Sequence, residues 1–67
     1  MAKIQLNGKT LTINEKLSIK DLCKKYQLNE KKIAIELNGI ILPKDDYSKK
    51  RLKNRDKIEI VHFIGGG

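Results

Sequence analysis

The segment of the sequence that could do chemistry is a run of three glycines, Gly65, Gly66 and Gly67. Glycine has no Cβ, so a glycine run can thread a narrow channel in a partner protein. The carboxylate of Gly67 is flanked by no side chain, which leaves it open to attack once a partner has activated it. Fully extended, residues 64–67 reach about 13–14 Å, enough to enter the active site of another protein. We therefore predict that Gly67 carries the reactive group and that a partner binds Gly65 and Gly66.

The alternative is that these glycines are only a frayed chain end, since termini are commonly disordered. The sequence favours function because the glycines follow directly on a segment of strong β formers, with no polar spacer between.

Apolar residues just before the glycines could dock the same partner. Val61 and Phe63 alternate on one side of a predicted strand, opposite Ile58 and Ile60, and Ile64 follows them. On an uncovered sheet face, Val61, Phe63 and Ile64 would form a docking patch for a protein. Alternatively, they pack beneath the polar loop that precedes the strand, and the sequence leaves both arrangements open.

The other reactive side chains are isolated, which argues against catalysis or metal binding by this chain. Cys23 is the only cysteine, so no intramolecular disulfide can form, and its place on an apolar helical stripe predicts burial. His62 is the only histidine and belongs to no metal or triad motif. The carboxylates show no catalytic spacing. We predict no metal site.

The elements that position the glycines are short strands separated by tight turns. Asn7-Gly8 and Asn38-Gly39 each stand between apolar segments, and both residue types tolerate the positive φ of a hairpin turn. Pro43 stops the fourth strand. The predicted strands cover residues 3–7, 10–14, 33–37, 40–42 and 57–63.

One helix is predicted over residues 19–26. Ser18 precedes it and Asp21 follows three residues later, which resembles a capping box with a short acidic partner. Apolar residues then recur at i, i+3, i+4 and i+7, so that they share one face of the helix. The residues on this face are Ile19, Leu22, Cys23 and Tyr26.

This order of elements predicts an α+β domain with a mixed sheet of four to five strands. One helix can cover only one face of such a sheet, so the other face should stay open. Tyr47 and Leu52 are predicted to anchor the long polar loop 44–55. The arrangement is the β-grasp, or ubiquitin-like, fold over residues 1–63, with residues 64–67 as a flexible tail.

Length and charge narrow the classes of function. A chain of 67 residues buries a small core, so an enclosed active site of its own is disfavoured and a carrier or binding module is favoured. The net charge of +7 would suit a nucleic-acid binder, but the basic residues are scattered and aromatic residues are few. We therefore expect no nucleic-acid partner. With neither a signal peptide nor a long apolar stretch, we expect a cytoplasmic protein without membrane contact.

Two segments carry a family resemblance. Residues 37–43 read Leu-Asn-Gly-Ile-Ile-Leu-Pro, and residues 56–67 end in Phe-Ile-Gly-Gly-Gly. They resemble the ThiS family, the sulfur carriers of thiamine biosynthesis, and the likeness covers essentially the whole chain. Arg55 departs from the pattern of that family, which customarily has Gly before the Asp of this turn.

The resemblance implies a carrier that acts as a co-substrate of other enzymes and is not itself an enzyme. An activating enzyme of the ThiF type would adenylate the carboxylate of Gly67 with ATP. Sulfur from cysteine, passed on by a cysteine desulfurase, would then convert it into a thiocarboxylate. A thiazole synthase of the ThiG type would accept the sulfur. The chain itself would bind no cofactor.

Three rival interpretations stay open. The first is a sulfur carrier of the same fold that serves molybdopterin synthase. The second is a basic β-grasp module that binds RNA. The third is a ubiquitin-like modifier that joins Gly67 to lysines of other proteins.

Overall fold

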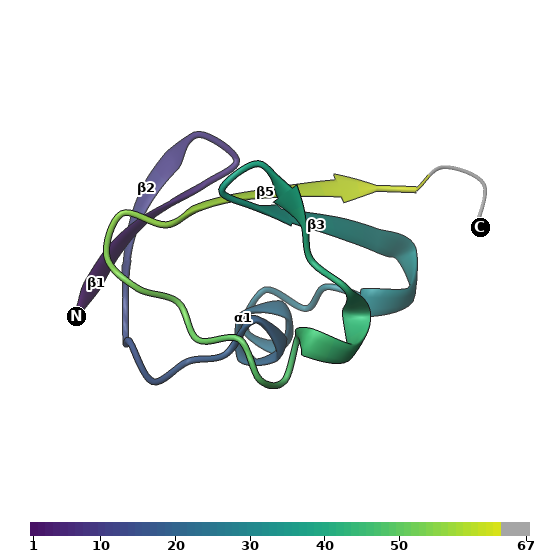
Figure 1. The fold of residues 1–67 in the computed structure, drawn as a ribbon, viewed down its shortest axis with the longest axis horizontal. Helices are drawn as coiled ribbons and strands as arrows, with labels where there is room; N and C mark the ends of the chain where they lie inside the picture. The colour runs from purple at the N-terminus through teal and green to yellow at the C-terminus, as the bar shows by residue number, and fades with distance from the viewer. Residues whose placement is uncertain (64–67) are drawn as a thin grey trace.

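A five-stranded sheet and one helix make up residues 1–63, the part of the chain that the computed structural model describes (Figure 1). The tail predicted for residues 64–67 lies outside the described residues. The strands are β1 (Ala2–Leu6), β2 (Lys9–Ile13), β3 (Ile33–Leu37), β4 (Ile40–Ile41) and β5 (Lys57–His62), the helix is α1 (Ile19–Lys25), and two 3-10 helices are η1 (Glu30–Lys32) and η2 (Lys44–Asp46).

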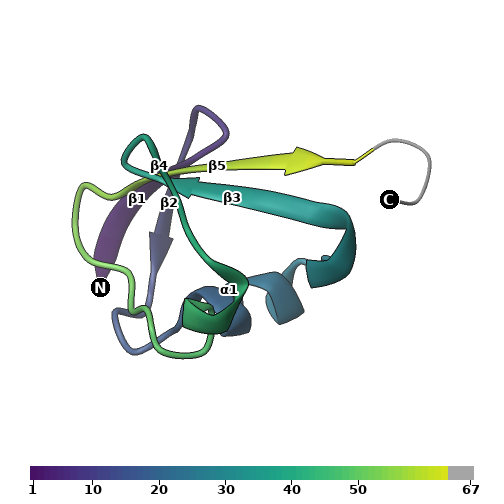
Figure 2. The same ribbon diagram turned by 45° about the vertical axis from the view of Figure 1, so that its right-hand side comes forward.

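The strand that comes last in the chain lies in the middle of the sheet. The strand order is β2-β1-β5-β3-β4. β5 runs parallel to β1, with Gln5 opposite Lys57, and antiparallel to β3, with Ile35 opposite Ile60. Helix α1 packs against one face and the other face is uncovered (Figure 2). The mixed sheet with one covering helix confirms the predicted β-grasp fold.

Two Asn-Gly turns shape the hairpins as predicted. In the first turn, Asn7 and Gly8 have φ values of 49° and 84°, and Asn38 and Gly39 in the second have 53° and 85°. Two successive positive φ values are typical of the two-residue turns that match the twist of paired strands. Because the first turn uses only Asn7 and Gly8, β1 ends and β2 begins one residue earlier than predicted.

Helix α1 has the predicted capping box at its start. The Ser18 hydroxyl accepts a hydrogen bond from the backbone N–H of Asp21, at 3.1 Å, and the Asp21 carboxylate accepts one from the N–H of Ser18, also at 3.1 Å. These hydrogen bonds hold the pKa of Asp21 below its usual value. The helix ends at Lys25, one residue earlier than predicted, and Tyr26, which caps it, is 41% exposed.

The loop between β4 and β5 is tied to the helix side of the sheet. Its two predicted anchors, Tyr47 and Leu52, are fully buried, which confirms the prediction. The N–H of Ile19 donates to the carbonyl of Lys50, at 2.9 Å, and the N–H of Lys20 donates to the carbonyl of Tyr47, at 2.8 Å. The core that results comprises Ala2, Ile4, Ile13, Ile19, Leu22, Cys23, Ile33, Ile35, Leu37, Tyr47, Leu52 and Ile58.

Candidate functional site

β5 carries the chain from the core of the sheet to the site at which the glycines begin. Its central position gives it hydrogen-bonded neighbours on both sides, β1 at its start and β3 along its length. The backbone N–H of Phe63, just past the strand, donates to the carbonyl of Lys32 at 2.8 Å. The end of β5 lies at the opposite end of the molecule from Met1 (Figure 1). The body of the domain therefore holds the chain in a fixed direction up to Phe63.

The predicted site residues beyond this point, Ile64, Gly65, Gly66 and Gly67, lie outside the described residues. Their predicted roles therefore stay predictions.

Val61 and Phe63 are exposed on the open face of the sheet. Val61 is 56% exposed and Phe63 is 46% exposed. Val61 lies opposite Ala34 and points away from α1, since Ile60, its neighbour in β5, lies opposite Ile35 in the core layer. These exposures contradict the alternative that the two side chains are buried beneath the loop 44–55, although Lys44 of that loop contacts the Phe63 ring.

The sequence interpretation missed two apolar residues of this surface, Ala34 and Ile41. Ile41, in the short strand β4, is 68% exposed and pairs with Glu36 on the open face. Because Ile40 and Ile41 are both apolar, the strand shows no alternation that could have assigned a face. We call Ala34, Ile41, Val61 and Phe63 the apolar patch.

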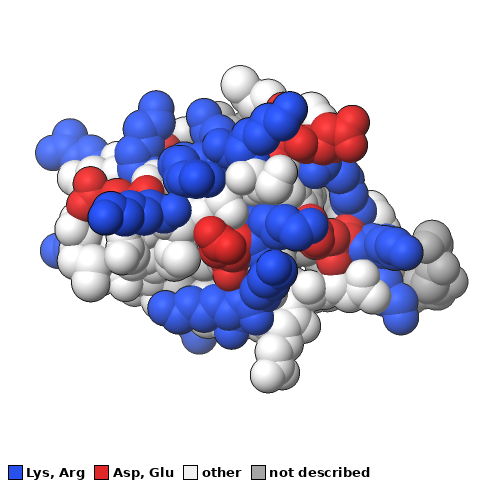
Figure 3. Space-filling view, turned by 90° about the horizontal axis from the view of Figure 1, so that it is seen from below, with Lys and Arg blue, Asp and Glu red and all other residues white. Residues whose placement is uncertain are grey.

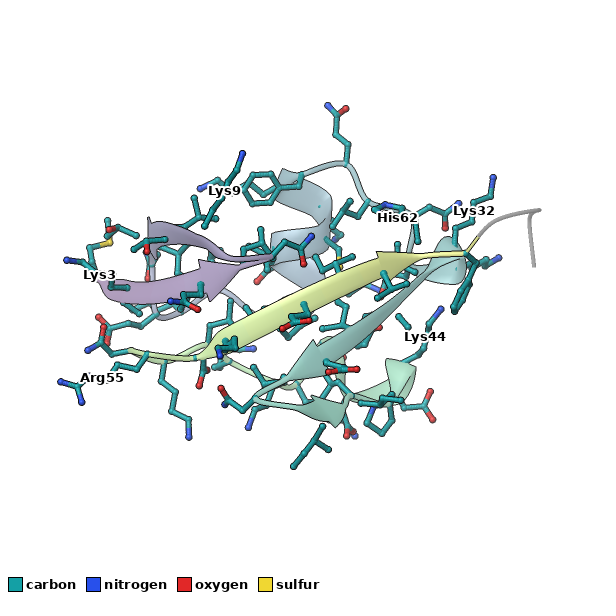
Figure 4. All side chains as sticks on the ribbon, turned by 90° about the horizontal axis from the view of Figure 1, so that it is seen from above. Lys3, Lys9, Lys32, Lys44, Arg55 and His62 are labelled. Carbon is teal, nitrogen blue, oxygen red and sulfur yellow. The ribbon has the colours of Figure 1, made fainter. Side chains whose placement is uncertain are left out.

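Lysine side chains border the apolar patch near the exit of the chain. The ammonium nitrogen of Lys44 lies 5.8 Å from the centre of the Phe63 ring, within the range of a cation–π contact. Lys44 also donates to the carbonyl of Glu30, which ties η2 to η1. Figure 4 shows Lys32 and His62 at this same end of the sheet. The exit therefore combines an exposed ring with positive charge.

Charges occupy the rest of the open face. Glu36 in β3 lies directly opposite Glu59 in β5, and Lys3 and Lys57 lie on the same face toward the start of β5. Neither glutamate forms an ion pair within residues 1–63. On the helix side, by contrast, Lys and Arg are spread over the surface with Asp and Glu between them (Figure 3). The open face thus has separate apolar, acidic and basic zones.

Cys23 and His62 contribute no reactive centre. Cys23 is buried as predicted, and burial raises the pKa of its thiol, so that it stays protonated and unreactive at neutral pH. His62 is exposed near the end of β5. Within the described residues, no group of three or more His, Cys, Asp and Glu side chains is placed to hold a metal ion. No helix in residues 1–63 has the length and apolar character needed to cross a membrane.

Comparisons with known proteins identify the family and agree with the fold. The ThiS family matches residues 4–67. The chain is 45% identical over 65 residues to the sulfur carrier protein ThiS of Bacillus subtilis, a match that covers 96% of this chain and 98% of that one. It is also 34% identical over 65 residues to a thiazole synthase of Paramagnetospirillum magneticum, covering 97% of this chain but 20% of that protein.

A solved structure has the same fold. The crystal structure of the thiamine biosynthesis protein ThiS from Geobacter metallireducens superposes with a TM-score of 0.81 and 28% identity, covering 97% of this chain and 99% of that one. The family match over nearly the whole sequence and the shared fold lead to one conclusion: this chain belongs to the ThiS family.

Proposed function

We propose that this sulfur carrier holds sulfur on the carboxylate of Gly67, as a thiocarboxylate, and delivers it for thiazole formation in thiamine biosynthesis. The observation that carries the proposal is the path of β5. The strand is fixed in the middle of the sheet and runs past an exposed apolar patch directly toward the glycines. A partner that docks on this patch would lie close to Phe63, after which the glycines follow in the sequence. Family membership supports the same role.

The chemistry needs an activating partner, because a free carboxylate is a poor acyl donor. In the proposed sequence an oxygen of the Gly67 carboxylate attacks the α-phosphorus of ATP, and pyrophosphate leaves. A desulfurase takes sulfur from cysteine as a persulfide, whose terminal sulfur attacks the acyl carbon, and AMP leaves with the oxygen. A thiol of the partner enzymes then attacks the other sulfur of the resulting acyl disulfide, which releases the thiocarboxylate and leaves a disulfide on the partner. The adenylating enzyme is of the ThiF type, and ATP is bound by that enzyme and not by this chain.

This chain contributes the reactive end and the surface that is recognised. Its one thiol is buried and protonated, so Cys23 is unsuited to relay the sulfur. The apolar patch offers exposed side chains of the kind that fill pockets in a protein interface. With the body docked outside, the extended tail reaches about 13–14 Å into the partner.

We propose a thiazole synthase of the ThiG type as the acceptor. A protein named thiazole synthase from Paramagnetospirillum magneticum has a region similar to this chain over about a fifth of its length. Joining a carrier to its acceptor in one chain raises their effective concentration, which favours two proteins that work in sequence. The proposal places these reactions in the cytoplasm, where ATP is available.

The intact mass of the protein tests the proposal. The chain is incubated with the activating enzyme, ATP and a sulfur donor, and its mass is measured before and after. We expect a gain equal to one oxygen replaced by sulfur, located at Gly67 by fragmentation. A variant that lacks Gly67 is the control and should gain no mass while it keeps the same melting temperature. An unchanged wild-type mass, with an activating enzyme shown to adenylate another carrier, would overturn the proposal.

A further inference from the structure

Arg55 has a backbone conformation that its side chain makes unfavourable. Its φ is +75°, and Gln27, with φ +56°, is the only other residue of this kind in the described chain that is neither Asn nor Gly. A residue with a Cβ is strained in this region, whereas glycine adopts it freely. Gln27 follows the end of a helix, where a left-handed residue is common. Arg55 does not follow a helix, so this explanation does not apply to it. The presence of an arginine instead of a glycine at this position therefore needs another explanation.

The turn that holds Arg55 is fixed by hydrogen bonds. The Asp56 carboxylate is 4% exposed and accepts hydrogen bonds from the N–H of Lys53, at 2.9 Å, and from the side-chain amide of Asn38, at 3.1 Å. The N–H of Arg55 itself donates to the carbonyl of Lys3, at 2.7 Å. The turn therefore presents the Arg55 side chain from a rigid backbone next to β1.

Three cations surround an open cleft at this end of the sheet. The cleft has a volume of about 500 Å³, and Lys3, Arg55 and Lys57 line it together with neutral residues. Figure 4 shows Lys3 and Arg55 at one end of the open face and Lys44 at the other. No carboxylate lines the cleft, and none of the three cations forms an ion pair within residues 1–63. We call this feature the basic cleft.

We propose that the basic cleft binds carboxylate side chains on the surface of the activating enzyme. The inference rests on the proposed function, which requires such an enzyme. Arginine suits the role because its planar guanidinium can hold a carboxylate through two parallel hydrogen bonds. Lys57 and His62 are five residues apart in β5, so the basic cleft lies about 17 Å along the strand from the chain exit. Contacts at both ends would fix the direction in which the tail enters.

The neighbouring charges favour a protein over a nucleic acid. Glu59 lines a second hollow together with Arg55 and Lys57, and Glu36 lies directly opposite Glu59. These carboxylates would repel a phosphate backbone, which is negative throughout. A protein surface can instead set acidic groups against the cleft and donors against the glutamates. In residues 1–63 the open face carries a single aromatic side chain, Phe63, at its far end, so it offers no stacking platform for bases.

Two glycine substitutions test the proposal. Arg55→Gly removes the guanidinium and relieves the backbone, whereas Gln27→Gly relieves the backbone at the end of α1, away from the open face. The affinity of each variant for the activating enzyme is measured without ATP, at low and at moderate salt. We expect Arg55→Gly to bind about tenfold more weakly at low salt, the loss typical of one charged hydrogen bond, and to show a smaller salt dependence. Gln27→Gly should bind as the wild type does.

A second variant removes another charge of the basic cleft without changing the backbone of the turn at Arg55. Lys57→Gln leaves a regular strand unchanged and should also weaken binding severalfold at low salt. Melting temperatures of both glycine variants should equal or exceed that of the wild type.

Several outcomes separate the two proposals. Wild-type affinity and salt dependence in both Arg55→Gly and Lys57→Gln would overturn the basic cleft while leaving the carrier function standing. A wild-type chain that gains no sulfur would overturn the carrier function, and the basic cleft with it. Tight, Arg55-dependent binding of a single-stranded RNA, with no loss of affinity for the enzyme, would assign the cleft to phosphate.

Discussion

Ile58 and Val61 stand three residues apart on the same strand, yet they belong to surfaces of opposite character. Ile58 faces α1 and is fully buried, and Leu37, which lies opposite it in β3, is buried as well. Val61 faces solvent, near exposed Phe63 and Ile41. The covered face is almost entirely aliphatic, and its residues interlock with the helix and the loop 44–55. The open face mixes exposed apolar groups with charges that form no ion pair within residues 1–63.

The difference between the two faces shows which of them stabilises this small domain. Burial of aliphatic side chains on the helix side stabilises the fold. The open face holds features that lower the stability of the free domain: exposed apolar area, two glutamates directly opposite one another, and the left-handed backbone of Arg55. Such features accumulate on the face where partners are proposed to bind, which is where a carrier that must be recognised would need them.

The largest expected effect comes from cutting a side chain on the covered face. Ile58→Ala should lower the free energy of unfolding by about 2–5 kcal/mol, because it leaves a cavity in the core. A domain of this size has only about 3–10 kcal/mol of stability, so the variant should be largely unfolded or close to it. Val61→Ala, on the same strand, should cost less than about 1 kcal/mol. Urea unfolding of both variants measures this, and equal losses would contradict the division between the faces.

A charge placed on the apolar patch should weaken partner binding while leaving the stability of the domain almost unchanged. Phe63→Asp should leave the melting temperature close to the wild-type value but weaken binding to the activating enzyme about tenfold or more, because a buried aromatic anchor is lost from the interface. Tyr26→Asp is the matched control, since Tyr26 is similarly exposed but lies on the helix side. Unchanged affinity of the Phe63 variant, measured by calorimetry, would show that the patch is not a contact.

Alkaline pH should lower the free energy of unfolding through two side chains that are buried on the covered face. Burial raises the pKa of both Cys23 and Tyr47, so the folded state holds their protons more tightly than the unfolded chain does. Their contribution to stability is fully present below about pH 9 and is lost as pH rises through the folded pKa values. The slope should not exceed about 1.4 kcal/mol per pH unit for each group. Tyr47→Phe should flatten part of it in unfolding experiments between pH 8 and pH 11.

The smallest effect is expected at the pair of glutamates. Glu36→Gln should stabilise the domain by about 0.2–1 kcal/mol by removing repulsion across β3 and β5. Glu59→Gln should give the same gain, and the double variant should add little to either single one. Additive gains in thermal unfolding would mean that the two carboxylates do not interact.

Much of the fold follows from local rules that can be read in the sequence. The Asn-Gly turns, the capping box of Ser18 and Asp21, and the burial of Tyr47 and Leu52 were all predictable, because each depends on residue chemistry over a short stretch. The end of α1 was predicted one residue late, with Tyr26 as the last residue of the helix. An amphipathic period does not say where a helix gives way to a left-handed residue such as Gln27.

The site was harder to predict because it depends on which strands become neighbours. Val61 and Phe63 were identified from alternation along β5, but their exposure depends on where the loop 44–55 packs. The basic cleft joins Lys3 and Lys57 only because β5 pairs in parallel with β1. Arg55 stood out in the sequence only as a departure from the glycine customary in the family, and its positive φ is known from the structure alone.

The central place of β5 also bears on how the protein is made. β5 follows every other strand in the chain, yet β1 and β3 both need it as a partner. Contacts between Gln5 and Lys57 join segments from the two ends of the domain, which slows folding and delays it until synthesis is nearly complete. A chain that stops before Lys57 would leave two unpaired strand edges, a state prone to aggregation and degradation. The cell would then contain few folded domains that lack β5, the strand that leads to residues 64–67.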